Sequence, residues 1–210
     1  LGASEELVEA IALAHDVGHP PFGHAGETAL KTILTEYDMD FEHNRQALRI
    51  VDRLEERYPD HPGLNLTWET REGIARHETF FDAPETPQAF QDYAQGGLEC
   101  QIANAADVIA YSTHDLEDAI QMRLVRAEEL AEVGLWRRGL EYRSADLGRL
   151  ADAPRIADTV RLRFTIRNMI ELLIRDVVAQ TRVGLADLKP HDPDDVRCAD
   201  AAVVRFSPET

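Results

Sequence analysis

The sequence predicts an all-α protein, because of the spacing of its apolar residues, the lack of strand patterns and the placing of its helix-ending residues. Apolar side chains recur three or four residues apart along most of the 210 residues, which is the period of a helix with one buried face. No stretch shows the sustained alternation that would indicate a sheet. With 44% hydrophobic residues, the chain can bury a core, and we expect a single domain over residues 1–210.

The first predicted helix begins after Ser4, whose hydroxyl suits the N-cap position. Its apolar positions are Leu7, Val8, Ile11 and Ala12. Gly18 and Pro20 end this helix. His15 and Asp16 are therefore expected in its last turn, next to a change in chain direction.

Further helices are predicted at about residues 26–34, 42–58, 68–77, 98–122 and 157–180. Pro, Gly and Asn between the segments at 42–58 and 68–77 indicate a loop. Residues 83–97 contain two prolines and a Gly-Gly pair, which favours a mobile connection or lid. A polar tail at 189–195 is followed by the run AAVVRF, which we expect to be extended.

The charge balance restricts the class of partner. The chain carries 39 acidic and 22 basic side chains and a formal charge of -17. General binding to nucleic acid is therefore not expected, because its affinity comes from neutralising phosphates. An anionic substrate remains compatible with this charge, since a cation and a few arginines in a cleft can reverse the field locally.

No membrane anchor or secretion signal is expected from the sequence. No apolar run approaches the roughly 20 residues needed to cross a bilayer, and the start lacks a basic region and a cleavage site. Cys100 and Cys198 lie far apart and have no metal-type spacing. We expect both to be free thiols in a cytoplasmic protein.

The segment HDVGHPPFGHAGE, from His15 to Glu27, holds three histidines, an aspartate and a glutamate. Imidazole and carboxylate groups are typical ligands of divalent transition metals. Adjacent helical residues point about 100° apart, so His15 and Asp16 can hold one ion only where the helix ends. The PPFG turn redirects the chain so that His24 and Glu27 can return to the same place. This pattern predicts a metal-dependent phosphohydrolase.

A second group of polar residues follows one face of the predicted helix at 98–122. Its members are Asp107, Tyr111, His114, Asp115 and Asp118. A carboxylate from this face could complete the metal site begun at His15. Small and branched apolar neighbours suggest that Asp107 and Tyr111 are buried, whereas Glu117 and Asp118 suit a solvated acidic face.

Five sequence blocks together resemble the bacterial deoxyguanosine triphosphate triphosphohydrolase family of the HD-domain superfamily. The blocks are HDVGHPPFGHAGE, FEHNRQALRI, LNLTWE, QIANAADVIAYSTHDLED and RFSPE. The resemblance implies an HD-domain helical bundle whose metal ligands are His15, Asp16 and Asp107. The fourth ligand of the family, an upstream histidine, has no match here. We therefore expect the 210 residues to lack N-terminal and C-terminal parts of the full-length family protein.

The resemblance also implies roles for other residues. His19, His24 and Glu27 would line the triphosphate site, with one histidine and the glutamate orienting and activating water. His43 would contact phosphate. The predicted substrate-binding residues are Asn44, Tyr111 and Asp115, with Tyr111 and Asp115 holding the deoxyribose.

The implied reaction is hydrolysis of a deoxynucleoside triphosphate at the α-phosphorus, which releases inorganic triphosphate. The cofactor would be Mn, Mg or another divalent transition metal, and the resemblance implies a homo-oligomer. Two alternatives remain open. One is an HD phosphohydrolase acting on nucleoside monophosphates or guanosine alarmones. The other is a nucleotide-binding regulatory subunit without catalysis, suggested by the missing upstream histidine.

The remaining histidines and the tryptophans are given less specific roles. His61 and His191 lie in polar segments and are expected at the surface. His77 is expected to end a helix, where a cation is mildly favoured, and not to contact the metal. Trp68 and Trp136 are expected to pack in the core.

Overall fold

A computed structural model describes residues 1–78, 86–142 and 154–208 of the chain. These residues form helices joined by turns, and no strand occurs among them apart from an isolated bridge between Glu56 and Gly63. The prediction of an all-α fold is therefore confirmed.

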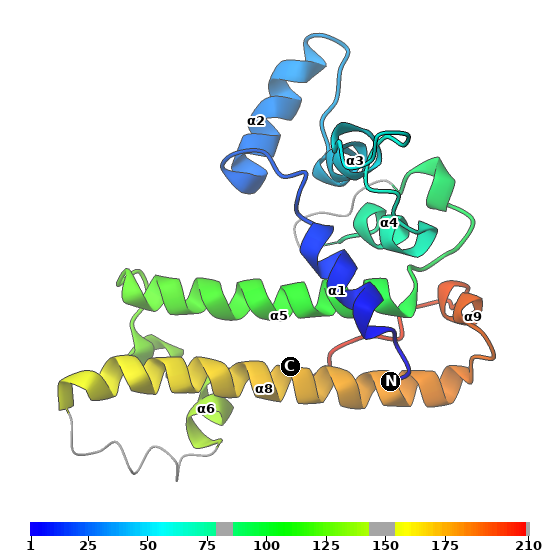
Figure 1. Ribbon diagram of the computed structural model, residues 1–210. Helices are drawn as coiled ribbons and strands as arrows, with labels where there is room; N and C mark the ends of the chain where they lie inside the picture. The colour runs from blue at the N-terminus through cyan, green and yellow to red at the C-terminus, as the bar shows by residue number, and fades with distance from the viewer. Residues whose placement is uncertain (79–85, 143–153, 209–210) are drawn as a thin grey trace. The chain divides into compact units, whose positions relative to one another are not determined.

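The helices follow one another along the chain as Figure 1 shows. The α-helices are α1 (Glu5–Ala14), α2 (Gly23–Thr35), α3 (His43–Arg49), α4 (Trp68–Ala75), α5 (Leu98–Gln121), α6 (Gly134–Glu141), α8 (Pro154–Leu188) and α9 (Pro193–Arg197). Shorter helical turns are the π-helix η1 (Ile50–Leu54) and the 3-10 helices η2 (Gln88–Phe90) and η3 (Ala127–Glu132).

The first helix forms as its sequence predicts. The Ser4 side chain accepts a hydrogen bond from the Leu7 backbone nitrogen at 3.3 Å, which satisfies one of the free N–H groups at the helix start. The helix ends at Ala14 and His15 is its C-cap. His15 and Asp16 thus lie where the chain leaves the helix.

Three of the predicted segments differ in the structure. The helix predicted at 42–58 is too long, because η1 ends at Leu54 and the following loop returns to donate from Leu64 N to Val51 O at 2.7 Å. The polar tail contains α9, which Asp192 caps and Pro193 begins. Those residues are helix-start signals. The AAVVRF run forms no strand, and Val203 N instead donates to Gln101 Oε1 at 2.9 Å.

The chain divides into two compact units. The first contains Leu1–Asn104 and Gly184–Val204, and the second contains Ala105–Val183 and Arg205–Thr210. The expectation that residues 1–210 form a single domain stays a prediction.

The core of the first unit lies where α3 and η1 meet α4. Ala47, Val51 and Ile74 are buried together. Partly buried apolar side chains that pack against them are Ala14, Leu48, Leu64 and Leu66. Ile11 of α1 is also buried and packs on α4 at Gly73, where a Cβ atom would overlap its side chain. The end of α1 is therefore held against both α3 and α4.

Gly18 allows the turn after α1 to approach α3 closely. A Cβ atom at this position would overlap the carbonyl oxygen of His43 and the backbone nitrogen of Ala47. Glycine is thus required here by lack of space. This close approach brings the His15–Asp16 turn next to the start of α3.

A buried ion pair joins α4 to α9. Arg197 of α9 donates from Nε to the Glu72 carboxylate at 3.0 Å, and its guanidinium lies 5.2 Å from the centre of the Trp68 ring. Both charged side chains are buried. Trp68 is half-buried, and it packs against this arginine and against the Phe90 ring, whose centre lies 5.6 Å from its own.

In the described residues of the second unit, α6 packs on α8. Trp136, Ile166 and Met169 form a buried cluster, and the buried Asn168 side chain donates to the carbonyl oxygens of Gly139 and Tyr142 at 2.8 and 2.7 Å. The prediction that Trp136 is a core residue is confirmed.

The described part of the predicted lid, residues 86–97, is attached to α4. The Arg76 guanidinium donates to the carbonyl oxygens of Phe90 and Tyr93, and the Phe90 side chain is buried. Residues 83–85 of the predicted lid lie outside the described residues. This attachment fixes the segment beside the C-terminal end of α4.

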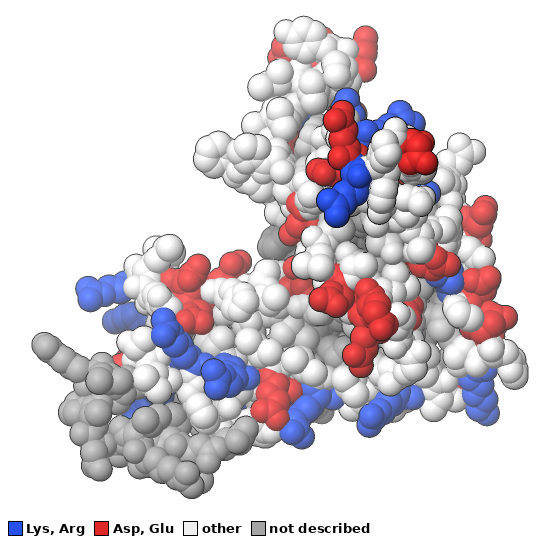
Figure 2. Space-filling view, in the orientation of Figure 1, with Lys and Arg blue, Asp and Glu red and all other residues white. Residues whose placement is uncertain are grey.

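The surface is acidic where α1 begins. Glu5, Glu6 and Glu9 are exposed there, and Figure 2 shows acidic side chains gathered over this region. Among the described helices, none combines the length and the hydropathy that crossing a membrane requires.

Replacing Gly18 by alanine is expected to destabilise the protein by about 1 to 3 kcal/mol, because the added methyl group overlaps backbone atoms of α3. Urea unfolding followed by circular dichroism measures this difference. Gly134→Ala is the matched control, since no heavy atom lies within 4 Å of the Cβ it would add. Equal stability of the two variants would contradict the close approach.

Both cysteines are free, as predicted, but only Cys198 is exposed. Burial raises the pKa of the Cys100 thiol to about 12, so this thiol is neutral and inaccessible at pH 8. We expect one fast reaction per chain with Ellman's reagent in native protein and a second thiol only after unfolding. Cys198→Ser should remove the fast reaction, and fast reaction of Cys100 in that variant would be the contrary result.

Candidate metal centre

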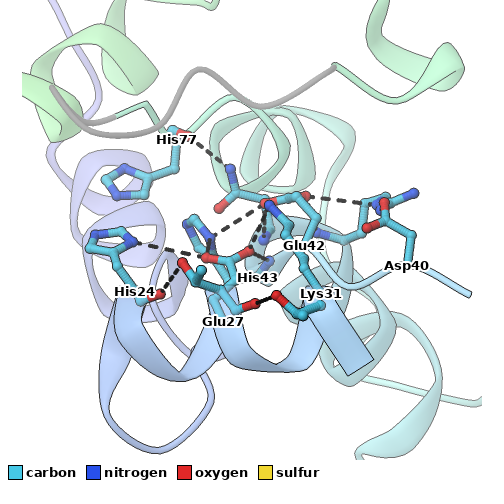
Figure 3. A network of polar contacts seen from close by, with 11 residues as sticks. His24, Glu27, Lys31, Asp40, Glu42, His43 and His77 are labelled. Atoms are coloured by element: carbon cyan, nitrogen blue, oxygen red, sulfur yellow. Dashed lines mark hydrogen bonds and ion pairs between the residues drawn. The ribbon is translucent and has the colours of Figure 1, made fainter. Parts of the chain in front are cut away.

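A cluster of histidine and carboxylate side chains lies in the first unit, where the end of α1, the start of α2, the start of α3 and the end of α4 meet. We call it the histidine cluster. Its members are His15, Asp16, His19, His24, Glu27, His43 and His77. Figure 3 shows the part of this cluster around Glu27 and His43. The structure therefore brings together the predicted site residues of the HDVGHPPFGHAGE segment with His43.

The His15 ring is oriented by the helix that it caps. Its Nδ1 lies 2.8 Å from the Ala12 carbonyl oxygen. A carbonyl only accepts hydrogen bonds, so Nδ1 carries the proton, and Nε2 faces the Asp16 carboxylate at 3.3 Å. A ring whose Nδ1 donates to a backbone carbonyl, which leaves Nε2 for the metal, is the usual arrangement of a metal-binding histidine.

Asp16 is at the centre of three imidazoles. Its carboxylate oxygens also lie 3.4 Å from His19 Nε2 and 3.7 Å from His77 Nε2. Burial would raise the pKa of Asp16, but the contact with His15 and the fields of His19 and His77 more than offset it and lower the pKa to about 2. Asp16 is therefore ionised at neutral pH and attracts a cation.

The His19 ring stacks on the His43 ring, with 4.1 Å between ring centres and 9° between planes. Burial, followed by the neighbouring His43, lowers the pKa of His19. Two stacked imidazolium ions would repel each other, so the arrangement favours a neutral His19. Its Nδ1 atom is buried without a hydrogen-bond partner among the described residues.

Glu27 holds His43 at two points. One carboxylate oxygen accepts from the His43 backbone nitrogen and the other lies against Nδ1, both at 3.1 Å. Lys31 Nζ and His24 Nδ1 approach the same carboxylate at 3.5 and 3.9 Å (Figure 3). Burial would raise the pKa of Glu27, but His43 and Lys31 more than compensate, so the pKa lies below its usual value.

The Glu27 contact leaves the other ring nitrogen of His43 as an acceptor. Because Nδ1 donates to the carboxylate, Nε2 carries the lone pair, and this buried atom has no hydrogen-bond partner in the described part of the chain. A carboxylate that orients a histidine in this way also stabilises the imidazolium formed when the ring takes a proton. His43 therefore has the geometry of a general base.

The neighbours of His43 hold the start of α3 in place. The Glu42 carboxylate caps the helix by accepting from the Asn44 and Arg45 backbone nitrogens at 2.7 and 2.8 Å. Asn44 is fully buried and its side chain donates to the His77 carbonyl oxygen at 2.8 Å. Asn44 therefore joins α3 to the end of α4. Its predicted contact with substrate stays a prediction.

The donor set of this cluster fits a divalent transition metal. His15, Asp16 and His77 each offer one ligand atom, and these atoms lie within 4.8 Å of one another. A second such group is formed by Asp16, His19 and His43. Imidazole nitrogen combined with carboxylate oxygen suits Mn, Fe, Co, Ni or Zn. His15 and Asp16 are the two predicted ligands that the first group contains.

Sequence reasoning excluded His77 from the metal contacts, whereas the structure places its ring beside Asp16 and leaves it 2% exposed. His77 was excluded because it was expected to end a helix, and α4 does end two residues before it, at Ala75. The spacing of 62 residues from His15 carries no local signal. The contact depends on the packing of α1 on α4, which the sequence pattern did not show.

Asp107, Tyr111 and Asp115 belong to the second unit. Asp107 and Tyr111 are half-buried, less than their apolar neighbours suggested, and His114 and Asp115 are exposed. Their predicted roles as a metal ligand and as deoxyribose contacts stay predictions. His61 and His191 are exposed, which confirms their expected place at the surface.

Relatives of known family resemble this chain over nearly its whole length. Deoxyguanosinetriphosphate triphosphohydrolase-like proteins from Ralstonia pickettii (strain 12J) and Roseobacter denitrificans are 44% and 40% identical, each over 99% of this chain and 53% and 54% of their own lengths. A protein of that name from Syntrophus aciditrophicus is 56% identical over 62% of this chain and 32% of its own length. The chain thus spans about half the length of the Ralstonia and Roseobacter relatives.

The sequence model of the HD domain matches residues 1–112. This range contains all members of the histidine cluster, including the His15–Asp16 pair. The chain belongs to the HD-domain family.

Proposed function

We propose that the protein is a metal-dependent phosphohydrolase that converts a deoxynucleoside triphosphate to a deoxynucleoside and inorganic triphosphate. The observation that carries the proposal is the Asp16 carboxylate, faced by three imidazole Nε2 atoms at 3.3 to 3.7 Å, next to the Glu27–His43 pair. The first feature supports binding of a cation and the second supports proton transfer. The names of the relatives support the choice of substrate.

His15 and Asp16 would hold the divalent ion, with Asp107 as a further proposed ligand. When bound, such an ion would polarise a phosphoryl oxygen and offset the charge that develops on the phosphate. The helix end fixes His15 through its Nδ1 contact with Ala12. The protein therefore supplies a preformed ligand for the ion that would bind the phosphate group.

Proton transfer is assigned to His43. Its Nε2 would accept a proton from the attacking water, while Glu27 keeps the ring oriented and stabilises the positive charge that results. A histidine oriented by a buried carboxylate is a common device for this task. Glu27 therefore acts as a positioning residue, held in turn by Lys31 at 3.5 Å.

His24 and His19 suit contacts with the polyphosphate. The His24 side chain is 45% exposed, and its ring lies 5.1 Å from His19 and 6.0 Å from His43. Imidazoles carry N–H donors that bind phosphate oxygens, and a protonated ring adds charge. The exposed His24 can therefore meet an anionic substrate despite the net charge of -17.

The activity is tested by incubating the 210-residue protein, and a version extended to its natural ends, with Mn²⁺ and each deoxynucleoside triphosphate. We expect inorganic triphosphate and the deoxynucleoside as products, measured by ion chromatography. Orthophosphate or pyrophosphate would instead favour a different HD phosphohydrolase. Nucleotide binding without any turnover in the extended protein would favour a regulatory subunit.

Substitutions are expected to separate metal binding from chemistry. His15→Ala and Asp107→Ala should lose metal and activity together, whereas Glu27→Ala should retain metal and lose about 10²- to 10⁴-fold in rate, the usual contribution of general acid–base catalysis. Metal content and turnover are measured on the same samples. Full activity of Asp107→Ala would show that Asp107 is not a ligand.

A further inference from the structure

The His77 ring faces the site of His15 and Asp16 from the end of α4. Its Nε2 lies 3.7 Å from Asp16 Oδ1, and its ring centre lies 4.4 Å from that of His15 in an edge-to-face arrangement. The side chain is 2% exposed. His77 is thus a buried imidazole held beside a carboxylate and a second imidazole.

Asn104 fixes which nitrogen of His77 carries the proton. The Asn104 Nδ2 atom donates to the Arg76 carbonyl oxygen at 3.1 Å, so Oδ1 is the atom that faces His77 Nδ1 at 3.0 Å. An amide oxygen only accepts, and Nδ1 must therefore donate. In a neutral ring this leaves the lone pair on Nε2, the nitrogen that faces Asp16.

The backbone of His77 is fixed as well. Its carbonyl oxygen accepts from Asn44 Nδ2 at 2.8 Å (Figure 3), and Asn44 is completely buried in α3. The ring and the backbone of His77 are thus held by two different helices. This is the support that a ligand on a rigid scaffold needs.

The contacts of His77 and His15 follow one pattern. Each ring donates from Nδ1 to a neutral oxygen, at 3.0 Å for His77 and 2.8 Å for His15. Each Nε2 then faces the Asp16 carboxylate, at 3.7 Å for His77 and 3.3 Å for His15. Two imidazole nitrogens and a carboxylate turned toward one another form a donor set that suits a divalent transition metal.

The distances suit one shared ion. Two donors about 2.1 Å from a metal lie about 3.0 to 3.4 Å apart at octahedral and tetrahedral angles. The two Nε2 atoms lie 3.3 and 3.7 Å from the Asp16 oxygens. His15 faces Oδ2 and His77 faces Oδ1, and one ligand atom from each of the three residues lies within 4.8 Å of the other two.

We propose that His77 is a direct ligand of the divalent ion held by His15 and Asp16, and that Asn104 is the positioning residue that presents its Nε2 atom. This assignment rests on one part of the proposed function, namely that the site binds a divalent ion. It supplies a ligand from the end of α4 that the HDVGHPPFGHAGE segment does not contain.

The test uses metal affinity, which needs no substrate. The 210-residue protein is freed of metal with a chelator and titrated with Mn²⁺ and with Co²⁺ by calorimetry. The variants are His77→Ala, His77→Gln and Asn104→Leu, each checked for folding by circular dichroism. His61→Ala is the matched control, because it removes an exposed histidine of the same unit.

We expect the dissociation constant to rise at least about 10-fold in both His77 variants and about 10- to 100-fold in Asn104→Leu, the range found for lost supporting contacts. The Co²⁺ absorption bands should shift in the His77 variants and stay unchanged in His61→Ala. The glutamine variant keeps the test valid if the alanine variant fails to fold.

Two results would overturn the assignment. Unchanged metal affinity and Co²⁺ spectra in the His77 variants would show that His77 contacts Asp16 by a hydrogen bond and does not bind the metal. The proposed function would not be affected by that result. A wild-type protein that binds neither ion would overturn the proposed function and the His77 assignment together.

Discussion

The arrangement of the site depends on the buried contact between Glu27 and His43. This carboxylate, carried by α2, accepts from both the backbone and the ring of the first residue of α3. It therefore ties the returning PPFG segment to the helix against which the His15–Asp16 turn packs. Burying a carboxylate is costly unless it is paired and hydrogen-bonded. Here His43 and Lys31 provide the pairing, and the cost of burial is offset by these contacts.

Around this contact, helix ends bring the remaining groups together. His15 is the C-cap of α1, His43 begins α3 and His77 follows α4. Side chains at helix ends can converge because the chain turns there, whereas neighbouring residues within a helix point about 100° apart. Gly18 and Gly73 make the convergence possible, since α3 and Ile11 occupy the space that their side chains would need.

Much of this could be predicted from the sequence, because the signals were local. The helical period indicated the all-α fold, and the density of histidines in one short segment indicated the metal site. The missed features were non-local. His77 reaches Asp16 only because α1 packs on α4, and the early end of the third helix results from a loop that returns to Val51. The helix α9 was a different failure, since its capping residues were present and were interpreted as a polar tail.

The hydrogen-bond acceptors of the three imidazole Nδ1–H groups differ in charge, and the electron density of each ring differs as a result. His15 donates from Nδ1 to a backbone carbonyl, His77 to an amide and His43 to an ionised carboxylate. A negatively charged acceptor pushes more electron density through the ring than a neutral one does. Chemically identical side chains thereby acquire a division of labour, with two moderate electron donors, His15 and His77, and one stronger donor, His43, held by Glu27.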